Sequence, residues 1–242
     1  MKQGKLTIVI PAFNEEKRLD SSLEKMAEFT SGLFASVEMI VVDDGSSDRT
    51  ASIARSFSES HKNSGPECRV ISFSENRGKG AAVRQGMLEA SGELALLTDA
   101  DLSTPIEEIE KLLGVMETGE ADIVIGSRAL KSSRIRVHQP WYREYGGKVF
   151  NLLVRLITML PFHDTQCGFK LFRLQSCRSI FAVQKTDRFA FDVEILYRAV
   201  KSGLRVVEEP VVWNHSAGST VNMLPDSWHT FCDLVRIRLS RG

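Results

Sequence analysis

Three aspartates stand where apolar runs of the sequence stop: Asp43 in MIVVDDGSSD, and Asp99 and Asp101 in LLTDADLSTP. Runs of Val, Ile and Leu are typical of buried parallel strands, and ligands bind at the carboxyl ends of such strands. Asp99 and Asp101 are alternate residues, so an extended segment puts both carboxylates on one side. Two hard oxygen ligands can hold Mg²⁺ or Mn²⁺, which can bridge diphosphate oxygens. We therefore expect a metal-bound nucleotide at this edge of a sheet.

Structural roles also explain these acids when each is taken alone. Asp43 precedes Gly45 and can close a tight turn, while Asp101 can cap a helix. The segment PAFNEE at residues 11–16 follows the first apolar run, and it fits an ordinary strand-to-helix turn as well as a nucleoside-binding rim. The combination of all three segments is what favours a ligand site.

The segment Asn76-Arg77-Gly78-Lys79-Gly80 offers two glycines, two cations and the expected start of a helix. This composition suits a phosphate group or a close approach of the backbone, although a glycine-rich turn with solvated cations explains it too. It matches neither GxxxxGK[ST] nor GxGxxG, so the sequence gives no support to an NTPase or a dehydrogenase.

Charge is distributed unevenly along the chain. The 242 residues have a formal net charge of zero, which gives no reason to expect nucleic-acid binding. In contrast, residues 128–155 carry seven Lys or Arg and one acid, Glu144. We expect this basic segment to face an anionic partner.

Alternating apolar runs and amphipathic stretches predict an α/β fold with a mostly parallel sheet flanked by helices. Strands are expected at 6–12, 37–43, 69–73, 93–98 and 122–126, with helices at 16–29 and 49–57, from about residue 78 and from about residue 105. Beyond residue 128 the pattern predicts helices at 149–160, 191–201 and 227–239 and a strand at 204–212. With 43% hydrophobic residues, the chain is expected to form one domain, residues 1–242.

Four scattered cysteines form no CxxC pair, which is typical of reduced cytosolic thiols. The N-terminus has no apolar leader, and no uncharged run approaches the ~20 residues of a spanning helix. We therefore expect a cytoplasmic protein.

The ordered set IVIPAFNEE, IVVDDGSSDRT, NRGKGAAVRQG, LLTDADLSTP, IVIGSR, DTQCGFKLF and FAFDVEILY runs from residue 8 to residue 197. In this the chain resembles the inverting family 2 glycosyltransferases of the GT-A fold. Within them it is similar to the polyprenyl-phosphate sugar synthases that make dolichyl-phosphate glucose or mannose. The ending VVWNHSAGSTV looks closer to the dolichyl-phosphate glucosyltransferase branch.

This resemblance implies that the domain has a nucleotide-binding half, about 1–128, and an acceptor-binding half, about 129–242. Asp99 and Asp101 would hold the metal, the ribose and the diphosphate, and Arg128 and Arg143 would grip an acceptor phosphate. Mannose synthases commonly have Gln where this chain has Ser103, so water would take that metal position. The residues implied for the nucleotide sugar are Pro11, Ala12, Asn14, Glu15, Asp43, Lys79 and Asp99.

The resemblance implies transfer of a hexose to a polyprenyl phosphate with Mg²⁺ or Mn²⁺. The hexose that it favours is glucose, donated by UDP-glucose. A phosphate monoester is already anionic at neutral pH, so it needs positioning more than a general base. The catalytic residues are then Asp101 and Arg128. Asp192 joins them as a base if the acceptor is a hydroxyl, and Asp164 is a second candidate base. The alternative for these two acids is structural, Asp164 holding its loop and Asp192 orienting a nearby cation.

A polyprenyl phosphate stays in the bilayer, so we expect peripheral contact with the cytoplasmic face of a membrane, in a pathway of protein glycosylation. Two apolar stripes with adjacent cations suit a membrane interface, one within 149–160 and one within 228–239, although both can instead pack on the core. Three other functions remain open: a GDP-mannose-dependent mannosyltransferase, a transferase to a sugar hydroxyl, and a nucleotide-sugar sensor without turnover. A nucleotidyltransferase would need an NTP.

Overall fold

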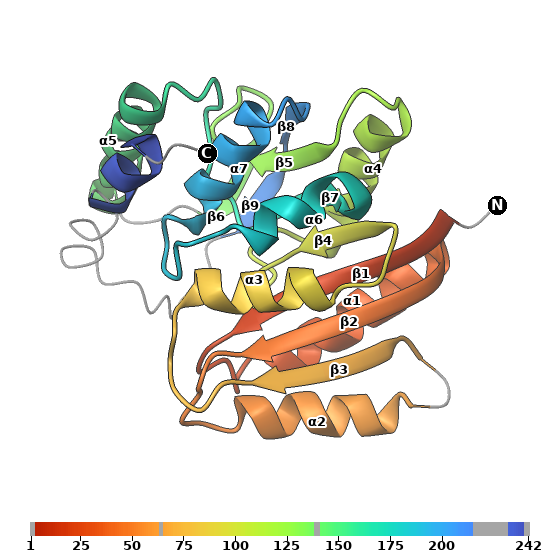
Figure 1. Cartoon of the computed structure of the whole chain (residues 1–242). Helices are drawn as coiled ribbons and strands as arrows, with labels where there is room; N and C mark the ends of the chain where they lie inside the picture. Colours follow the sequence, from red (N-terminus) through yellow and green to blue (C-terminus); the bar gives the residue numbers. More distant parts are fainter. Residues whose placement is uncertain (1–2, 63–64, 138–140, 215–231, 240–242) are drawn as a thin grey trace.

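A seven-stranded sheet runs through the computed structural model, which describes residues 3–62, 65–137, 141–214 and 232–239 (Figure 1). The strand order is β3-β2-β1-β4-β7-β5-β8, and only β7 runs antiparallel to its neighbours. A small parallel pair, β6 and β9, lies outside this sheet. The strands are β1 (Gln3–Ala12), β2 (Phe34–Asp43), β3 (Glu67–Ser72), β4 (Leu94–Leu97), β5 (Ile123–Ser127), β6 (Arg134–Val137), β7 (Lys170–Arg173), β8 (Val206–Pro210) and β9 (Val212–Asn214).

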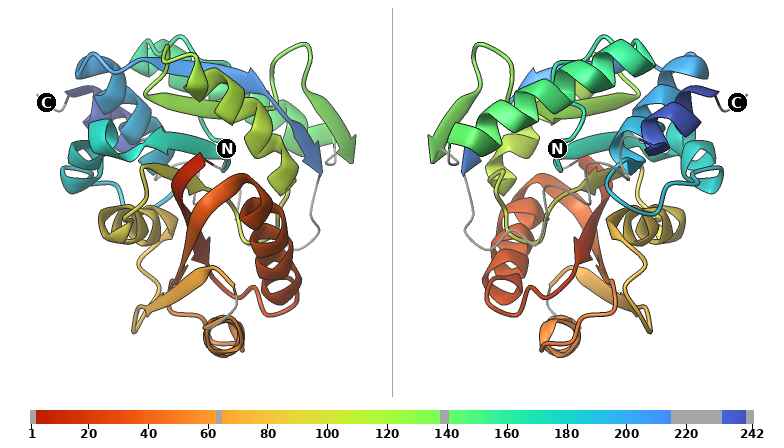
Figure 2. Two further views of the ribbon diagram at one scale, coloured as in Figure 1. Left: turned by 90° about the vertical axis from the view of Figure 1, so that its right-hand side faces the viewer. Right: turned by 90° about the vertical axis from the view of Figure 1, so that its left-hand side faces the viewer.

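Helices cover both faces of the sheet, as Figure 2 shows. One face packs against α1, α2 and α4, and the other against α3, α5, α6, α7 and a helix at 232–239. Successive residues of the strands alternate between the two cores, with Ile8 in the first and Val9 in the second. The helices are α1 (Leu19–Leu33), α2 (Thr50–Ser60), α3 (Lys79–Glu89), the 3₁₀ turn η1 (Ile106–Glu108), α4 (Ile109–Glu117), α5 (Trp141–Thr158), α6 (Leu174–Ala182) and α7 (Phe191–Lys201).

The expected α/β fold is confirmed, and each expected strand before residue 128 is present within a few residues of its predicted bounds. The prediction for α7 matches to the residue. The helix α1 begins at Leu19 and not at residue 16, and its buried residues include Leu23, Met26 and Ala27, which recur at helical spacing. The last helix is described at 232–239, and the rest of its predicted range lies outside the described residues.

Two features of the second half of the sheet differ from what the sequence predicted. The expected strand at 204–212 is split at Val211, so that β8 joins the main sheet and β9 pairs with β6. The strand β7, which inserts between β4 and β5, was not predicted from the sequence. It pairs antiparallel on both sides, through four residues with β4 and three with β5, and Lys170 lies opposite Leu97 and Ile125. The start of β7 therefore lies at the carboxyl ends of β4 and β5.

Glu38 stabilises the interior of the sheet, several residues beyond the edge where the parallel strands begin. Its side chain is 2% exposed and accepts hydrogen bonds from the Thr7 hydroxyl at 2.6 Å and from the Ser91 amide at 3.0 Å. Arg69 lies 3.1 Å from its other oxygen. Burial acts to raise the pKa of Glu38, but the hydrogen bonds from Thr7 and Ser91 outweigh it and hold this pKa below its usual value.

We expect Glu38→Gln to lower the free energy of unfolding at pH 7 by about 2 kcal/mol, because charge-assisted hydrogen bonds in a buried site are lost. A lowered folded-state pKa stabilises the fold above the unfolded value of about 4.3, and this contribution disappears as the pH falls through the folded value. Urea denaturation at pH 7 and in steps below pH 4.5 measures both effects. Equal stability of variant and wild type at pH 7 would contradict the prediction.

Candidate functional site

The carboxyl edge of the sheet gathers most of the residues that the sequence singles out. β1 ends at Ala12 and β2 at Asp43, Asp99 and Asp101 follow β4, and Arg128 follows β5. These strands are parallel, so their ends meet at one edge. Lys79 reaches the same edge from the first residue of α3.

The loops after β1 and β2 are joined by hydrogen bonds. The exposed Asn14 has a positive φ of 55°, its amide donates to the Ser46 hydroxyl at 2.9 Å, and its side-chain oxygen accepts from the Ser47 amide at 3.0 Å. The Glu15 amide donates to the Thr50 hydroxyl at 2.7 Å. These bonds hold the segment 11–15 against the segment 43–50.

Asp43 is 3% exposed, and its Oδ1 accepts from the Ser46 amide at 3.2 Å. The tight turn considered as a structural role for this acid is therefore present. Pro11 and Ala12 are also buried beside it at the end of β1, which pairs with β2 in register. The residues that the resemblance assigns to a nucleoside thus form one continuous rim.

Asp44 organises the glycine-rich loop, a role that the sequence analysis did not assign. Its carboxylate accepts from the Arg77 amide at 2.7 Å, the Gly78 amide at 2.9 Å and the Asn76 side chain at 2.9 Å. Gly78 has a φ of +107°, a conformation that favours glycine, and α3 begins at the next residue. The pair of adjacent aspartates at the end of β2 was the sequence signal for this role. Asp43 closes the tight turn, and Asp44 binds the glycine-rich loop.

Asp99 lies between a cation and a glycine. Its Oδ1 is 2.5 Å from the Lys79 ammonium, and its carboxylate lies so close to the Gly168 backbone that a side chain there would overlap it. Burial acts to raise the pKa of Asp99, but the charges of Lys79, Lys170 and Arg128 hold it below its usual value. The side chain remains 35% exposed, so an ionised carboxylate faces the edge.

Asp101 is held by a local turn and a long ion pair. Its two oxygens accept from the Ser103 amide and hydroxyl, both at 2.9 Å. Arg18 lies 3.6 Å from it and 2.6 Å from Glu15, so this arginine joins the segment after β1 to the segment after β4. Burial raises the pKa of Glu15, and Asp101 and Asp99 add to the rise while Arg18 opposes it.

The donor set fits a divalent ion that is shared with a bound diphosphate. Among the described residues no three His, Cys, Asp or Glu side chains form a metal cluster. Asp99 and Asp101 offer two carboxylates, and Mg²⁺ is commonly bound by one or two carboxylates with substrate phosphates and water. Ser103 donates to Asp101 through its hydroxyl. His215 follows the expected strand at 204–212, as Asp99 and Asp101 follow theirs, and it lies outside the described residues.

Arg128 is fixed by a bidentate pair with Asp164. Its Nε and Nη2 donate to the two carboxylate oxygens at 2.7 and 2.9 Å, its amide donates at 3.0 Å, and its guanidinium lies 5.6 Å from the ring centre of Trp213. Burial acts to raise the pKa of Asp164, but Arg128 holds it below its usual value. Asp164 also accepts from the Gln166 amide, so it holds its loop as the structural alternative predicted. Arg143 lies in α5, and its side chain is outside the described part of the structure.

Asp192 is paired with a lysine that the sequence analysis did not single out. It is 5% exposed in the first turn of α7, and its Oδ1 lies 2.5 Å from the Lys170 ammonium. Burial raises its pKa above the usual value, although Lys170 and Lys79 oppose the rise. The two candidate bases, Asp164 and Asp192, thus each face a cation.

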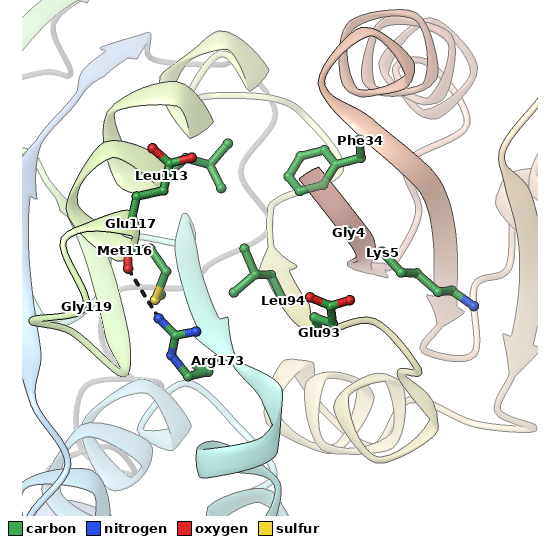
Figure 3. Close-up of a pocket in the computed structure, with 10 residues that line it drawn as sticks. All are labelled: Gly4, Lys5, Phe34, Glu93, Leu94, Leu113, Met116, Glu117, Gly119 and Arg173. Atoms are coloured by element: carbon green, nitrogen blue, oxygen red, sulfur yellow. Dashed lines mark hydrogen bonds between the residues drawn. The ribbon is translucent and has the colours of Figure 1, made fainter. Parts of the chain in front are cut away.

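A cavity of about 360 Å³ lies at the opposite edge of the sheet (Figure 3). Gly4, Phe34 and Leu94 line it from the starts of their strands, together with Met116 and with Arg173 at the end of β7. Its lining includes none of the residues at the carboxyl edge, so the acids and cations described above lie apart from it.

Comparisons with known proteins agree with this geometry. Residues 7–181 match the family described as glycosyl transferase family 2. A dolichyl-phosphate beta-glucosyltransferase of Dictyostelium discoideum is 36% identical over 96% of this chain and 73% of its own length. Proteins of the same name from Drosophila melanogaster and Homo sapiens are 38% and 36% identical, each over 88% of this chain and 68% of its own length.

Solved structures show the same fold. Glucosyl-3-phosphoglycerate synthase from Mycobacterium tuberculosis, in complex with Mn²⁺ and UDP-glucose, has a TM-score of 0.71 at 19% identity, covering 98% of this chain and 79% of that one. Its complex with UDP has a TM-score of 0.69 at 20% identity, with coverages of 99% and 80%. The sheet therefore has the GT-A architecture of nucleotide-sugar transferases. Because the family match spans most of the chain and the relatives align over nearly all of it, the protein belongs to glycosyl transferase family 2.

Proposed function

We propose that this enzyme transfers glucose from UDP-glucose to dolichyl phosphate or a related polyprenyl phosphate, with inversion and with Mg²⁺ or Mn²⁺. The observation that carries the proposal is the similarity to dolichyl-phosphate beta-glucosyltransferases over at least 88% of this chain in three distant organisms. The family match at residues 7–181 includes the segments that build the carboxyl edge. The glucosyl donor is further supported by neighbours of the same fold that are solved with UDP-glucose.

On the donor side, the rim of residues 11–15 and Asp43 receives the nucleoside. Asp99 and Asp101 would hold the divalent ion, which, when bound, stabilises negative charge on the diphosphate leaving group. Lys79 stands at the first residue of α3, so its ammonium and the helix N-terminus both favour an anion there.

On the acceptor side, Arg128 binds the lipid phosphate. Asp164 and Trp213 hold its guanidinium in place, which reduces the entropy lost when a phosphate is bound. The phosphate oxygen is already ionised at neutral pH and attacks the anomeric carbon directly, because it has no proton to lose. Arg128 holds the pKa of Asp164 low, and Asp192 is 5% exposed and therefore shielded from an acceptor; both observations support this mechanism over one that needs a general base.

The acceptor end of the lipid must reach the site from a bilayer, and α5 offers a suitable surface. Leu152, Leu156 and Met159 are 55%, 63% and 72% exposed, and Arg155 lies among them. The helix at 232–239 lies at the same end of the molecule and exposes Leu239 (Figure 1). Among the described residues no helix is long and apolar enough to cross a membrane. We place α5 against the cytoplasmic face of a membrane as a peripheral contact of the acceptor-binding half, about 129–242.

We expect purified protein with Mn²⁺ and polyprenyl phosphate to move label from UDP-glucose, and not from GDP-mannose, into an organic extract. Parallel incubations with the two labelled donors measure this. Label from GDP-mannose alone would replace the proposal with a mannosyltransferase. Donor binding without extractable label would point to a hydroxyl acceptor or a sensor.

We expect Asp101→Ala to lower kcat about 10²- to 10³-fold, because a charged group that stabilises the leaving diphosphate is lost. The fold should persist, since Asp101 lies at the rim. Asp122→Ala is the matched control, because Asp122 precedes β5 at the opposite edge, where it accepts from the Arg205 amide. Calorimetric titration of Mn²⁺ with UDP should show weaker binding for Asp101→Ala alone. Turnover near wild type would remove Asp101 from the mechanism.

We expect Arg128→Lys to raise the acceptor KM about tenfold and to leave the donor KM nearly unchanged. Lysine keeps the charge but cannot donate in the bidentate geometry that binds carboxylate and phosphate. Arg205→Lys, an exposed position at the opposite edge, serves as the control. Initial rates over a range of polyprenyl phosphate concentrations give both constants. An unchanged acceptor KM would count against this role.

A further inference from the structure

Lys170 occupies the junction between the donor and acceptor sides of the site. It is the first residue of β7, and its backbone is in register with Leu97 of β4 and Ile125 of β5. Leu97 lies just before the segment that carries Asp99, and Ile125 lies just before Arg128. Because β7 is antiparallel, its start enters the sheet at the edge where these two strands end.

The ammonium group of Lys170 is completely enclosed. The side chain is 1% exposed and donates to Asp192 Oδ1 at 2.5 Å and to the carbonyl oxygen of Cys167. Its charge also helps to keep the pKa values of Asp99 and Asp164 low. One buried cation thus interacts with three carboxylates from different segments.

The hydrogen bond from the Lys170 ammonium to the Cys167 carbonyl oxygen holds a loop that contacts both sides of the site. Cys167 precedes Gly168, whose backbone lies against the Asp99 carboxylate. The same loop begins with Asp164, which fixes the guanidinium of Arg128. A shift of this loop would therefore move the metal-binding acid and the acceptor-binding arginine together.

We propose that Lys170 and Asp192 form a positioning pair that holds the loop 164–168 in place. Through this loop the pair fixes the distance between Asp99 on the donor side and Arg128 on the acceptor side. The pair touches neither substrate. This inference rests on the proposed transfer for its kinetic consequences, while its structural part depends only on the described contacts. It assigns Asp192 to positioning and not to proton transfer.

The test must separate positioning from stability, because removing one partner of a buried ion pair leaves an unpaired charge. The double variant Lys170→Met with Asp192→Leu removes both charges together, and replacing a buried ion pair by hydrophobic residues of similar volume is often neutral for stability. We expect it to fold, to show faster amide hydrogen exchange in residues 164–169, and to lose about 10²-fold in kcat. A displacement of about 1 Å at reacting groups can have an effect of this size.

Two further variants keep the experiment decisive. Glu38→Gln also disturbs a buried carboxylate, but far from this edge, so its folded form should keep the wild-type kcat and the wild-type exchange in 164–169. Gly168→Ala keeps every charge and pushes a methyl group against Asp99, so we expect a loss of kcat similar to that of the double variant. It tests the loop contact even if the double variant does not fold.

Wild-type exchange and kcat in the double variant would overturn the positioning role, as would wild-type kcat in Gly168→Ala. Failure of the wild-type protein to transfer glucose would overturn the proposed function and leave the exchange result standing. The positioning role and the proposed function can therefore be refuted independently.

Discussion

Burial of charge at the carboxyl edge of the sheet constrains the rest of the structure. Three carboxylates meet there, and each faces a cation from another segment: Asp99 with Lys79, Asp164 with Arg128, and Asp192 with Lys170. An unpaired charge in such a place is costly, so each pair fixes the segments that carry it. The pairs tie α3 to the end of β4, the loop after α5 to the end of β5, and α7 to the start of β7.

This pairing also determines what chemistry the edge can support. Fixed charges that already point at a reaction centre stabilise developing charge without reorganising during the reaction. A carboxylate whose pKa is held low by a hydrogen-bonded cation, as Arg128 does for Asp164, is a poor proton acceptor, because protonation would break the pair. An acceptor that arrives ionised suits such a site better than a hydroxyl, and a lipid phosphate meets that requirement.

The sequence predicted the parts of the site that follow from local patterns. Apolar runs that end in Asp43 and Asp99 located the strand ends, and a glycine before Lys79 located the start of α3. Lys170 and Arg18 could not be found in this way, because their importance comes from residues distant in the chain. The four residues of β7 are too short for a periodic signal, and their antiparallel insertion departs from the βα repeat that precedes them. Asp192 was singled out from the sequence, but its partner Lys170 was not.

Glu38 and Asp99 show how one sheet uses carboxylates in two ways. Glu38 accepts from hydroxyl and amide donors and is 2% exposed, so its surroundings are complete within the protein. Asp99 has a flexible lysine on one oxygen and is 35% exposed, so it remains accessible to a ligand. The first arrangement contributes stability between the strands, inside the sheet. The second leaves an ionised group at the edge where they end, which is where a parallel sheet binds its ligands.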